Sequence, residues 1–494
     1  MPLIATHELL TDPTDPQIYN GNDVCRTFGI QTRIETLPLY GPTHKLSLAM
    51  QGPAMEMMLR GFLIDPVERD RSITDIKSRL SGINSALAQL VHAISGQTTG
   101  FDSSPYFFNS SQQIQHLFYD VMRIKPIEKH FRGETKRPMD EETLEKIRTR
   151  YPRARVLAAA ILACRDLTKQ REKLEMEVDD DWRIRSSVNI AGTNEGRMSY
   201  SKSFIGTGGN LQNVDPRLRR MFISDPGYKL CGVDKEQIDS RYVGLLCGLL
   251  FDDWTYLDMC ESGDCHTSVA RMVWPELKWT GDLKRDRLIA EEPFHNETRR
   301  QSCKILGHGT NIMGTSQTLA IETGIPKHEI EIFQERYFTA IPAIPKLHRW
   351  IAWKIEKDQF LTNIFNRRRD FFDRPDSPET HRKGMAFMQA SPSADDTNLG
   401  GLRMWLHMGS RIQLLTQEHD AWYFQFREDD NEEEIVAEAQ KHMKVEIPIS
   451  NTRVFSVPTE AKTGWNKGLR WQIDKNGNKN EVNPRGLDKP GAKR

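Results

Sequence analysis

The chain lacks the features of secreted, membrane-spanning and disulfide-bonded proteins. Its 494 residues contain no run of about 18 or more apolar residues and no basic segment followed by an apolar leader. The seven cysteines are scattered and include no Cys-X-X-Cys pair, so we expect reduced thiols rather than disulfides or a zinc site. Charged residues make up 28% of the chain, and its mean hydropathy is −0.59. These values predict a soluble, cytoplasmic protein without a membrane partner.

An excess of charge of either sign is also missing. Lys+Arg and Asp+Glu both number 68. The overall charge therefore does not indicate nucleic-acid binding, and any attraction to an anionic partner must come from local patches. No G-x-x-x-x-G-K-[ST] segment is present, which argues against a P-loop ATPase. The length is sufficient for several subdomains and a sizeable core.

An aspartate stands between an apolar run and a helical pattern in the middle of the chain. Residues 228–233 form a short apolar run, which predicts a buried strand, and apolar residues recur at roughly helical spacing over 238–246. Asp234 would therefore lie where a strand opens onto a helix, a position suited to holding a metal ion. One carboxylate is not sufficient for magnesium chemistry, so a partner must come from elsewhere.

The partner that we infer is Asp420. Two β-type runs, ending at Leu415 and starting at Trp422, surround a short polar break, which predicts a hairpin with Asp420 at its turn. Two aspartates on adjacent strands suit two Mg²⁺ ions, with Mn²⁺ as a substitute. Such a centre can stabilise the attacking and the leaving oxygen of a phosphoryl displacement. Taken singly, each residue is equally compatible with an ordinary turn aspartate.

A third segment places Arg300, Lys304, His308 and Ile312 at four-residue steps, which on a helix share one face. A cationic face that ends in small residues suits a triphosphate. Glycine costs about 1 kcal/mol relative to alanine inside a helix, so residues 307 and 309, both glycine, need a reason such as the close approach of another group. The alternative is a solvated basic helix face.

Together these segments resemble the DNA polymerase I family, also called family A. The family's palm motif Asp-Tyr-Ser-Gln-Ile-Glu-Leu-Arg is similar to residues 234–241, its fingers-helix motif to 300–312, and its last palm motif, His-Asp-Glu, to 419–421. Order and spacing agree from Arg185 to Gly468. Further similarity lies at 195–199, 210–214, 264–267 and 387–391, which resemble Thr-Gly-Arg-Leu-Ser, Asn-Leu-Gln-Asn-Ile, Asp-(Ile/Val)-His and Pro-Met-Gln-Gly-Thr.

The resemblance implies an α/β (α+β) right-hand polymerase fold, with an antiparallel palm sheet, helical fingers and a helical thumb. Heptad-like apolar spacing over 73–94 and a second helix over about 152–174 suit an antiparallel thumb pair. The mixed charges within 133–150 suit a loop that contacts phosphates, and they are equally compatible with an ordinary helical hairpin that has a solvated loop. The expected divisions are an exonuclease-like tail and linker at 1–60, the thumb at 61–182, the first part of the palm at 183–250, the fingers at 251–384, and the second part of the palm with a flexible basic C-terminal tail at 385–494.

The reaction implied by the resemblance is template-directed addition of dNTPs to a primer 3′-hydroxyl, with primer-template DNA as partner. Asp234 and Asp420 would hold two Mg²⁺ ions, with the backbone carbonyl of Lys235 as a further ligand, and Lys304 would protonate the pyrophosphate. The expected nucleotide-binding residues are Arg300, Lys304, His266, Gln237, Asp239, His308 and Ile312. The expected DNA-binding residues are Arg197, Gln389, Asn210, Gln212 and His419.

An exonuclease site is not expected. Tyr19 and Asp23 resemble the last catalytic helix of the family's proofreading domain, but no Asp-x-Glu precedes them. We therefore expect a polymerase lacking most of the exonuclease domain, with a separate exonuclease or processivity subunit as a possible partner. A basic turn at 366–369 is expected on the template. The first 50 residues are expected to be rich in loops, with a helix over Cys25–Ile34.

Four positions depart from the family pattern. Asp239 stands where Glu closes the sugar pocket, Ile312 where Tyr stacks under the template base, His308 where an aromatic residue contacts the nucleotide, and Ala421 where Glu follows the catalytic aspartate. These departures indicate a divergent, phage-encoded member that acts in the cytoplasm of a bacterium or a phage-infected host. They also leave open a polymerase of relaxed selectivity, for bypass or modified nucleotides.

Two other readings are weaker. A catalytically inactive polymerase fold that only binds primer-template is disfavoured, because Asp234, Arg300, Lys304 and Asp420 are all retained. A single-subunit RNA polymerase would share the two aspartates, but the segments at 210–214 and around Gln389 fit the DNA enzymes better.

Overall fold

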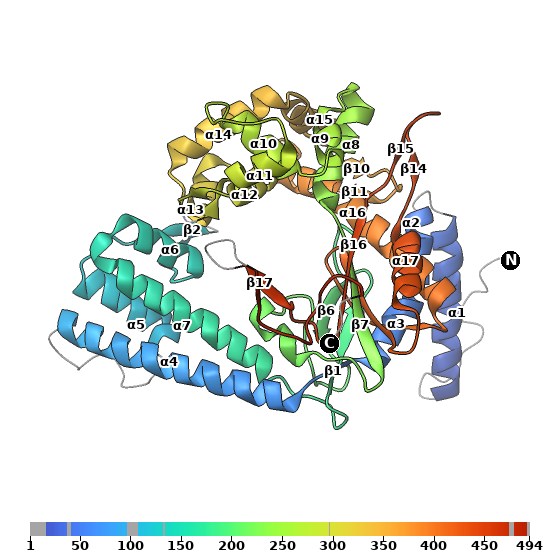
Figure 1. Cartoon of the computed structure of the whole chain (residues 1–494), viewed down its shortest axis with the longest axis horizontal. Helices are drawn as coiled ribbons and strands as arrows, with labels where there is room; N and C mark the ends of the chain where they lie inside the picture. The colour runs from blue at the N-terminus through green and yellow to red at the C-terminus, as the bar shows by residue number, and fades with distance from the viewer. Residues whose placement is uncertain are drawn as a thin grey trace.

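The computed structural model describes residues 16–36, 41–95, 107–131, 134–295, 297–473 and 479–491. Figure 1 shows a central sheet with one helical part drawn in blue to teal on one side and a second, in green to yellow, above it. In the described ranges, no helix combines the length and apolar character that crossing a membrane requires.

The sheet is antiparallel throughout and has the order β12-β13-β7-β16. Residues 229–233 are buried in succession, so both faces of this strand are covered by other parts of the chain. This confirms the predicted buried strand and the predicted hairpin. The strands are β7 (Tyr228–Lys235), β12 (Ile412–Glu418), β13 (Ala421–Arg427) and β16 (Thr459–Gly464).

The first helical part is built on two long helices, α4 (Pro66–Ser95) and α7 (Arg155–Leu174), which pack against each other as their apolar spacing predicts. The prediction of a loop within 133–150 is wrong. Most of it is helix α6 (Glu141–Arg150), because Asp140 accepts a hydrogen bond from the amide of Thr143 at 2.9 Å and caps the helix. Shorter elements here are η1 (Phe107–Asn109), α5 (Ser111–Gln115), η2 (His116–Val121), β2 (Lys129–Phe131), β3 (Glu134–Lys136) and η3 (Pro152–Ala154).

The second helical part has a hydrophobic core of its own, which includes Phe333, Tyr337 and Ile344. Its helix α13 also packs against α6, so the two helical parts touch each other away from the sheet (Figure 1). The elements are α8 (Ile238–Phe251), α9 (Thr255–Glu261), α10 (Cys265–Val273), α11 (Leu283–Ala290), β8 (Pro293–Phe294), β9 (Glu297–Thr298), α12 (Arg299–Asn311), α13 (Ser316–Thr323), α14 (Lys327–Ala340) and α15 (Ala343–Asp358).

One long helix, α16 (Pro378–Met408), connects this second part to the sheet by packing against α8, α15, α17 and β12. It includes Pro392, which removes one backbone donor from the helix interior. The elements around it are β10 (Phe360–Thr362), β11 (Arg368–Asp370), α17 (Glu432–Met443), β14 (Ile447–Pro448) and β15 (Val454–Phe455).

Both ends of the chain differ from expectation. The first 50 residues are not mainly loop, because α1 (Pro16–Glu35) and α2 (Pro42–Ala49) account for most of their described part and lead into α3 (Gln51–Arg60). Asp23 is exposed on α1, and the side chain of Tyr19 lies outside the described residues. The prediction of a flexible C-terminal tail is also wrong. Its described residues form β17 (Trp471–Ile473) and β18 (Lys479–Glu481) and then pair with β16 through a bridge between Thr463 and Asp488.

The remaining short elements lead from the first helical part into the sheet. They bring the segment around residue 197 and the basic segment at 216–221 next to the strands. They are β1 (Phe62–Leu63), β4 (Arg183–Ile184), β5 (Ser186–Asn189), β6 (Ser199–Lys202) and η4 (Pro216–Met221).

Candidate active site

Asp234 and Asp420 lie side by side at one end of the sheet. Asp234 is the penultimate residue of β7, and its partner across the ladder is Ala421, the first residue of β13. Asp420 is the second residue of the two-residue turn between β12 and β13, and its carbonyl accepts a hydrogen bond from the amide of Lys235 at 3.4 Å. His419, the first turn residue, has φ +51°, as a tight hairpin turn requires.

These carboxylates form a site of concentrated negative charge. Desolvation, aided by the neighbouring carboxylates of Asp239 and Asp234, raises the pKa of Asp420 to about 7. Desolvation also raises the pKa of Asp234 above its usual value. Asp420 Oδ1 is buried and makes no hydrogen bond to any described residue. A buried carboxylate oxygen without a donor is a ligand atom that a hard cation would satisfy.

The donor set fits a magnesium ion that keeps other ligands. No three His, Cys, Asp or Glu side chains in the described ranges are arranged to hold a metal ion by themselves. Two carboxylates completed by water and substrate phosphates are the arrangement that Mg²⁺ prefers. The side chain of Lys235 is fully buried against Asp396, with Nζ 2.7 Å from Oδ1, so its predicted role could involve only the backbone carbonyl.

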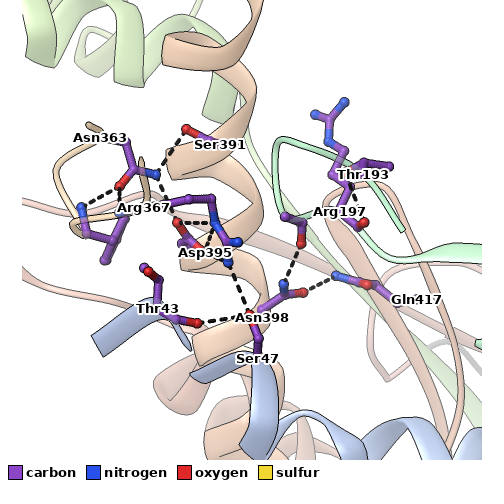
Figure 2. A network of polar contacts seen from close by, with 12 residues as sticks. Thr43, Ser47, Thr193, Arg197, Asn363, Arg367, Ser391, Asp395, Asn398 and Gln417 are labelled. Carbon is purple, nitrogen blue, oxygen red and sulfur yellow. Dashed lines mark hydrogen bonds and ion pairs between the residues drawn. The ribbon is translucent and has the colours of Figure 1, made fainter. Parts of the chain in front are cut away.

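The guanidinium of Arg197 lies beside this site, with Nη2 at 3.6 Å from both Asp239 Oδ1 and Asp420 Oδ1. Its loop is held from several sides (Figure 2). Thr193 Oγ1 donates to the carbonyl of Arg197 at 3.0 Å, and Asn398 Nδ2 donates to the carbonyl of Gly196 at 3.1 Å. These bonds fix the backbone on both sides of the guanidinium-bearing residue.

The basic turn at 366–369 supports the same loop rather than presenting three free charges. Arg367 pairs with the fully buried Asp395, with Nη2 2.7 Å from Oδ1, as Figure 2 shows. Gly196 has φ +86°, and a Cβ there would lie 2.5 Å from Cζ of Arg367. Arg369 donates to Glu195 at 2.8 Å. The arginines of this turn are thus ion-paired within the protein, so they do not present free positive charges to a template strand.

The predicted phosphate-binding residues lie together in the second helical part. Arg300 Nε donates to Asp264 Oδ2 at 2.8 Å, which leaves the rest of its guanidinium available. Burial and the nearby charge of Arg300 lower the pKa of His266 to about 4, with a further contribution from Lys304. The imidazole of His266 is therefore neutral at pH 7, next to two cations. Lys304 is exposed and close enough to Asp234 to oppose the rise in the pKa of that carboxyl.

The helix that carries this cationic face ends earlier than expected. α12 stops at Asn311, so Ile312 is the residue after its last turn rather than part of the face. The space around Gly307 and Gly309 also differs. A Cβ at Gly309 would lie 2.4 Å from Cδ2 of Leu319 on α13, whereas a Cβ at Gly307 would have no neighbour closer than 3.8 Å. A side chain at position 309 would therefore require Leu319 of the neighbouring helix α13 to move.

Helix α16 links the sugar-pocket position to the cationic face. Ser393 Oγ donates to Asp239 Oδ1 at 2.7 Å, and Gln389 Nε2 lies 3.1 Å from His308 Nδ1. Ser393 was not predicted, although it follows Gln389 by four residues and so shares its helix face. Gln237 precedes α8 with φ +54°, and its buried Oε1 makes no hydrogen bond to a described residue.

The remaining predicted DNA-binding residues surround the Arg197 loop. Gln212 donates to the carbonyl of Met198 at 3.1 Å, and Asn210 accepts the amide of Gln212 at 2.8 Å, so the first supports the loop and the second shapes a turn. His419 is exposed, and desolvation, together with the charges of Arg197 and Arg219, lowers its pKa.

Comparison with known proteins agrees with this geometry. The model of the family described as DNA polymerase family A matches residues 77–472. The chain is 25% identical over 407 residues to "DNA polymerase I, thermostable" of Thermus caldophilus, covering 78% of this chain and 44% of that protein. It is 25% identical over 374 residues to the DNA polymerase of Escherichia phage T5, covering 69% of this chain and 42% of that protein. The chain thus spans less than half the length of either relative.

A solved structure is similar over most of the chain. The POL domain of Pol1 from M. smegmatis, in complex with DNA primer-template and dNTP, matches with a TM-score of 0.66 and 19% identity, covering 85% of this chain and 69% of that one. The likeness confirms the expected α/β polymerase fold.

Proposed function

The chain belongs to DNA polymerase family A, and on that premise we propose that it is a DNA-dependent DNA polymerase that adds dNTPs to a primer 3′-hydroxyl. The observation that carries the proposal is the pairing of β7 with β13, which brings Asp234 and Asp420 together at one end of the sheet. Lys304 lies within electrostatic reach of Asp234 and belongs to the same group as Arg300 and His266. Metal-binding carboxylates facing phosphate-binding cations are the parts that phosphoryl transfer needs.

Asp234 and Asp420 would hold two Mg²⁺ ions, or Mn²⁺ in their place. Bound there, the ions supply positive charge to the attacking and leaving oxygens. Asp264 holds Nε of Arg300 and so orients the guanidinium toward a triphosphate. Lys304 is the proton donor to the leaving pyrophosphate, and neutral His266 donates a hydrogen bond to the phosphates without adding a third charge.

The DNA partner would be a primer-template duplex. Arg197 and Gln389 are assigned to its minor groove, where acceptors occur on every base pair and sequence is read poorly. A copying enzyme requires this tolerance. His419, Asn210 and Gln212 complete the DNA-contacting set, with Gln212 acting through the Arg197 loop.

We also propose a division of the chain into the three parts of a right-hand polymerase. The first helical part would be the thumb (61–182), the second the fingers (251–384), and the sheet with its flanks the palm (183–250 and 385–494). The site of action would be the cytoplasm of a bacterium or a phage-infected host. A separate exonuclease or processivity subunit would be an additional partner.

One observation favours a second candidate, a polymerase of relaxed selectivity. Asp239 is one methylene shorter than the glutamate of the family pattern, and Ser393 holds it at 2.7 Å. The nucleotide-facing His308 is in turn paired with Gln389. Both contacts would change the sugar pocket, and therefore the preference for dNTPs over rNTPs or modified nucleotides.

Primer extension on a defined primer-template, with dNTPs or rNTPs offered separately, tests both candidates. Wild type should extend with dNTPs, Asp420→Ala should not, and Asp429→Ala should match wild type because Asp429 is exposed on the turn after β13. Equal use of rNTPs would favour the second candidate. Tight DNA binding without extension by wild type would instead favour an inactive, DNA-binding role.

A further inference from the structure

A lysine is buried directly behind the turn that carries Asp420. Lys467 is 2% exposed and donates a hydrogen bond to Glu418, which is 5% exposed. Its Nζ lies 4.4 Å from the ring centroid of Tyr423 and within 6 Å of those of Phe62 and Phe222. Burial holds the pKa of Lys467 well below its usual range. The pair therefore lies in a largely apolar surrounding, which opposes the positive charge on the lysine.

Glu418 is placed where it can control the turn. It is the last residue of β12, pairs across the ladder with Ala421, and immediately precedes His419 and Asp420. Because His419 is in the left-handed region with φ +51°, the turn is held in a conformation that a non-glycine residue rarely adopts. A second cation, Arg219 of η4, lies 3.7 Å from the other carboxylate oxygen of Glu418.

The segment that supplies Lys467 is itself firmly held. The amide of Lys467 donates to the carbonyl of Phe222 at 2.9 Å. Asn466 and Asn483 exchange side-chain hydrogen bonds at 3.1 and 2.8 Å. The amide of Leu487 donates to the carbonyl of Gly468 at 2.7 Å. These hydrogen bonds tie the described part of residues 464–491 together and to the segment at Phe222.

We propose that Lys467 is a positioning residue, which fixes Glu418 and thereby sets where His419 and Asp420 stand in the active site. The proposal rests on the proposed function, since it gives the two turn residues their roles. Stability alone does not account for the pair. Apolar or neutral residues of similar volume often replace a buried ion pair with no loss of stability, whereas removing one partner leaves an uncompensated charge and is strongly destabilising.

Removing one charge of the pair or both charges therefore has different effects on stability, and this difference separates a positioning role from a structural one. Lys467→Met should lower the unfolding midpoint, because it leaves the carboxylate of Glu418 buried with only the more distant Arg219. Glu418→Gln keeps the side-chain shape but leaves Lys467 buried without its carboxylate partner, so it should lower the midpoint as well. The Lys467→Met/Glu418→Gln double variant removes both charges and should unfold near the wild-type midpoint. The matched control is Arg470→Met/Glu481→Gln, an ion pair of the same C-terminal segment with Nε 2.6 Å from Oε1.

Two readouts are needed on these full-length variants. The first is Mn²⁺ binding in the absence of DNA, followed by electron paramagnetic resonance. The second is primer extension, with kcat, the dNTP KM and the Mg²⁺ concentration for half-maximal rate measured separately. Residues behind metal ligands typically change metal affinity or activity about 10- to 100-fold. We expect a loss of that size in Mn²⁺ affinity and in kcat for Glu418→Gln and for the double variant, with the dNTP KM little changed.

The outcomes distinguish this proposal from the proposed function. Wild-type Mn²⁺ affinity and kcat in Glu418→Gln or in the folded double variant would overturn the positioning role. An equal loss in the Arg470→Met/Glu481→Gln control would do the same, because the effect would then belong to the whole segment. Wild type that binds Mn²⁺ but extends no primer would remove the proposed function, while the comparison of Mn²⁺ affinities would still decide whether Lys467 positions the metal-binding turn.

Discussion

Replacing Asp420 with asparagine should stabilise the metal-free protein while abolishing its activity. The pKa of Asp420 rises from the ordinary value of 3.8 to about 7, chiefly through desolvation and then through the neighbouring carboxylate of Asp239. At 1.36 kcal/mol per pKa unit, that difference is on the order of 4 kcal/mol by which ionised Asp420 disfavours the folded state at pH 8. Asparagine has a similar shape and no charge, so it should recover most of this free energy.

The dependence on pH follows from the direction of the shift. Because the folded pKa lies above the unfolded one, Asp420 favours folding at low pH, and this contribution is lost as pH rises from about 4 through about 7. The stability of wild type should therefore fall relative to Asp420→Asn across that range. Below about pH 4 the ionisation of Asp420 should no longer separate the two proteins.

Urea unfolding in EDTA, from pH 4 to pH 8, measures this difference. Asp429→Asn is the control, because Asp429 is 76% exposed and should show no such gain. Mg²⁺ should then stabilise wild type at pH 8 more than Asp420→Asn, since a ligand bound only to the folded state adds to its stability. Equal stability of wild type and Asp420→Asn at pH 8, or a gap that widens as pH falls, would refute the reasoning.

Two further predictions concern the cationic face. Gly309→Ala should destabilise the protein by about 1 to 3 kcal/mol, because its Cβ would lie 2.4 Å from Cδ2 of Leu319. Gly307→Ala should be neutral or stabilising by up to about 1 kcal/mol, because a Cβ there has no neighbour closer than 3.8 Å. Thermal unfolding of the two variants measures the difference, and equal unfolding midpoints would contradict the prediction. Asp264→Asn should raise the dNTP KM about 10-fold while kcat changes less, because Arg300 loses a charge-assisted hydrogen bond that orients it. Steady-state extension measures both constants, and an unchanged KM would show that Asp264 does not orient Arg300.

Local patterns were sufficient for the elements that carry the carboxylates. The apolar run before Asp234 and the polar break at Asp420 each lie within a few residues of the feature that they predict, and β7 and the β12–β13 hairpin follow them. Helix α6 was missed although its signals were present, since Asp140 is a capping residue and Leu144 and Ile147 are three apart. The mixture of charges on its exposed face resembled a loop.

Local sequence patterns could not predict the ion pairs that hold the site in place, because each pair joins residues far apart in the chain. Asp395 meets Arg367 across 28 positions, and Glu418 meets Lys467 across 49. The residues next to Asp395 or Lys467 in the sequence do not indicate that these side chains are buried, since aspartate and lysine are usually exposed. The C-terminal segment was misjudged for a related reason. Its glycines and asparagines are typical of loops, but here they permit close backbone contacts such as that between Gly464 and Gly486.

Single-turnover incorporation of one dNTP, compared among wild type, Asp234→Asn, Asp420→Asn and the double variant, tests the central claim most directly. If the two carboxylates form one metal-binding unit, each single change should reduce the rate by about 10³-fold or more, and the double variant should be little worse than either, because residues that act as a unit are not additive. Retention of near wild-type incorporation after loss of either aspartate would contradict the claim that the β7–β13 edge is the catalytic centre.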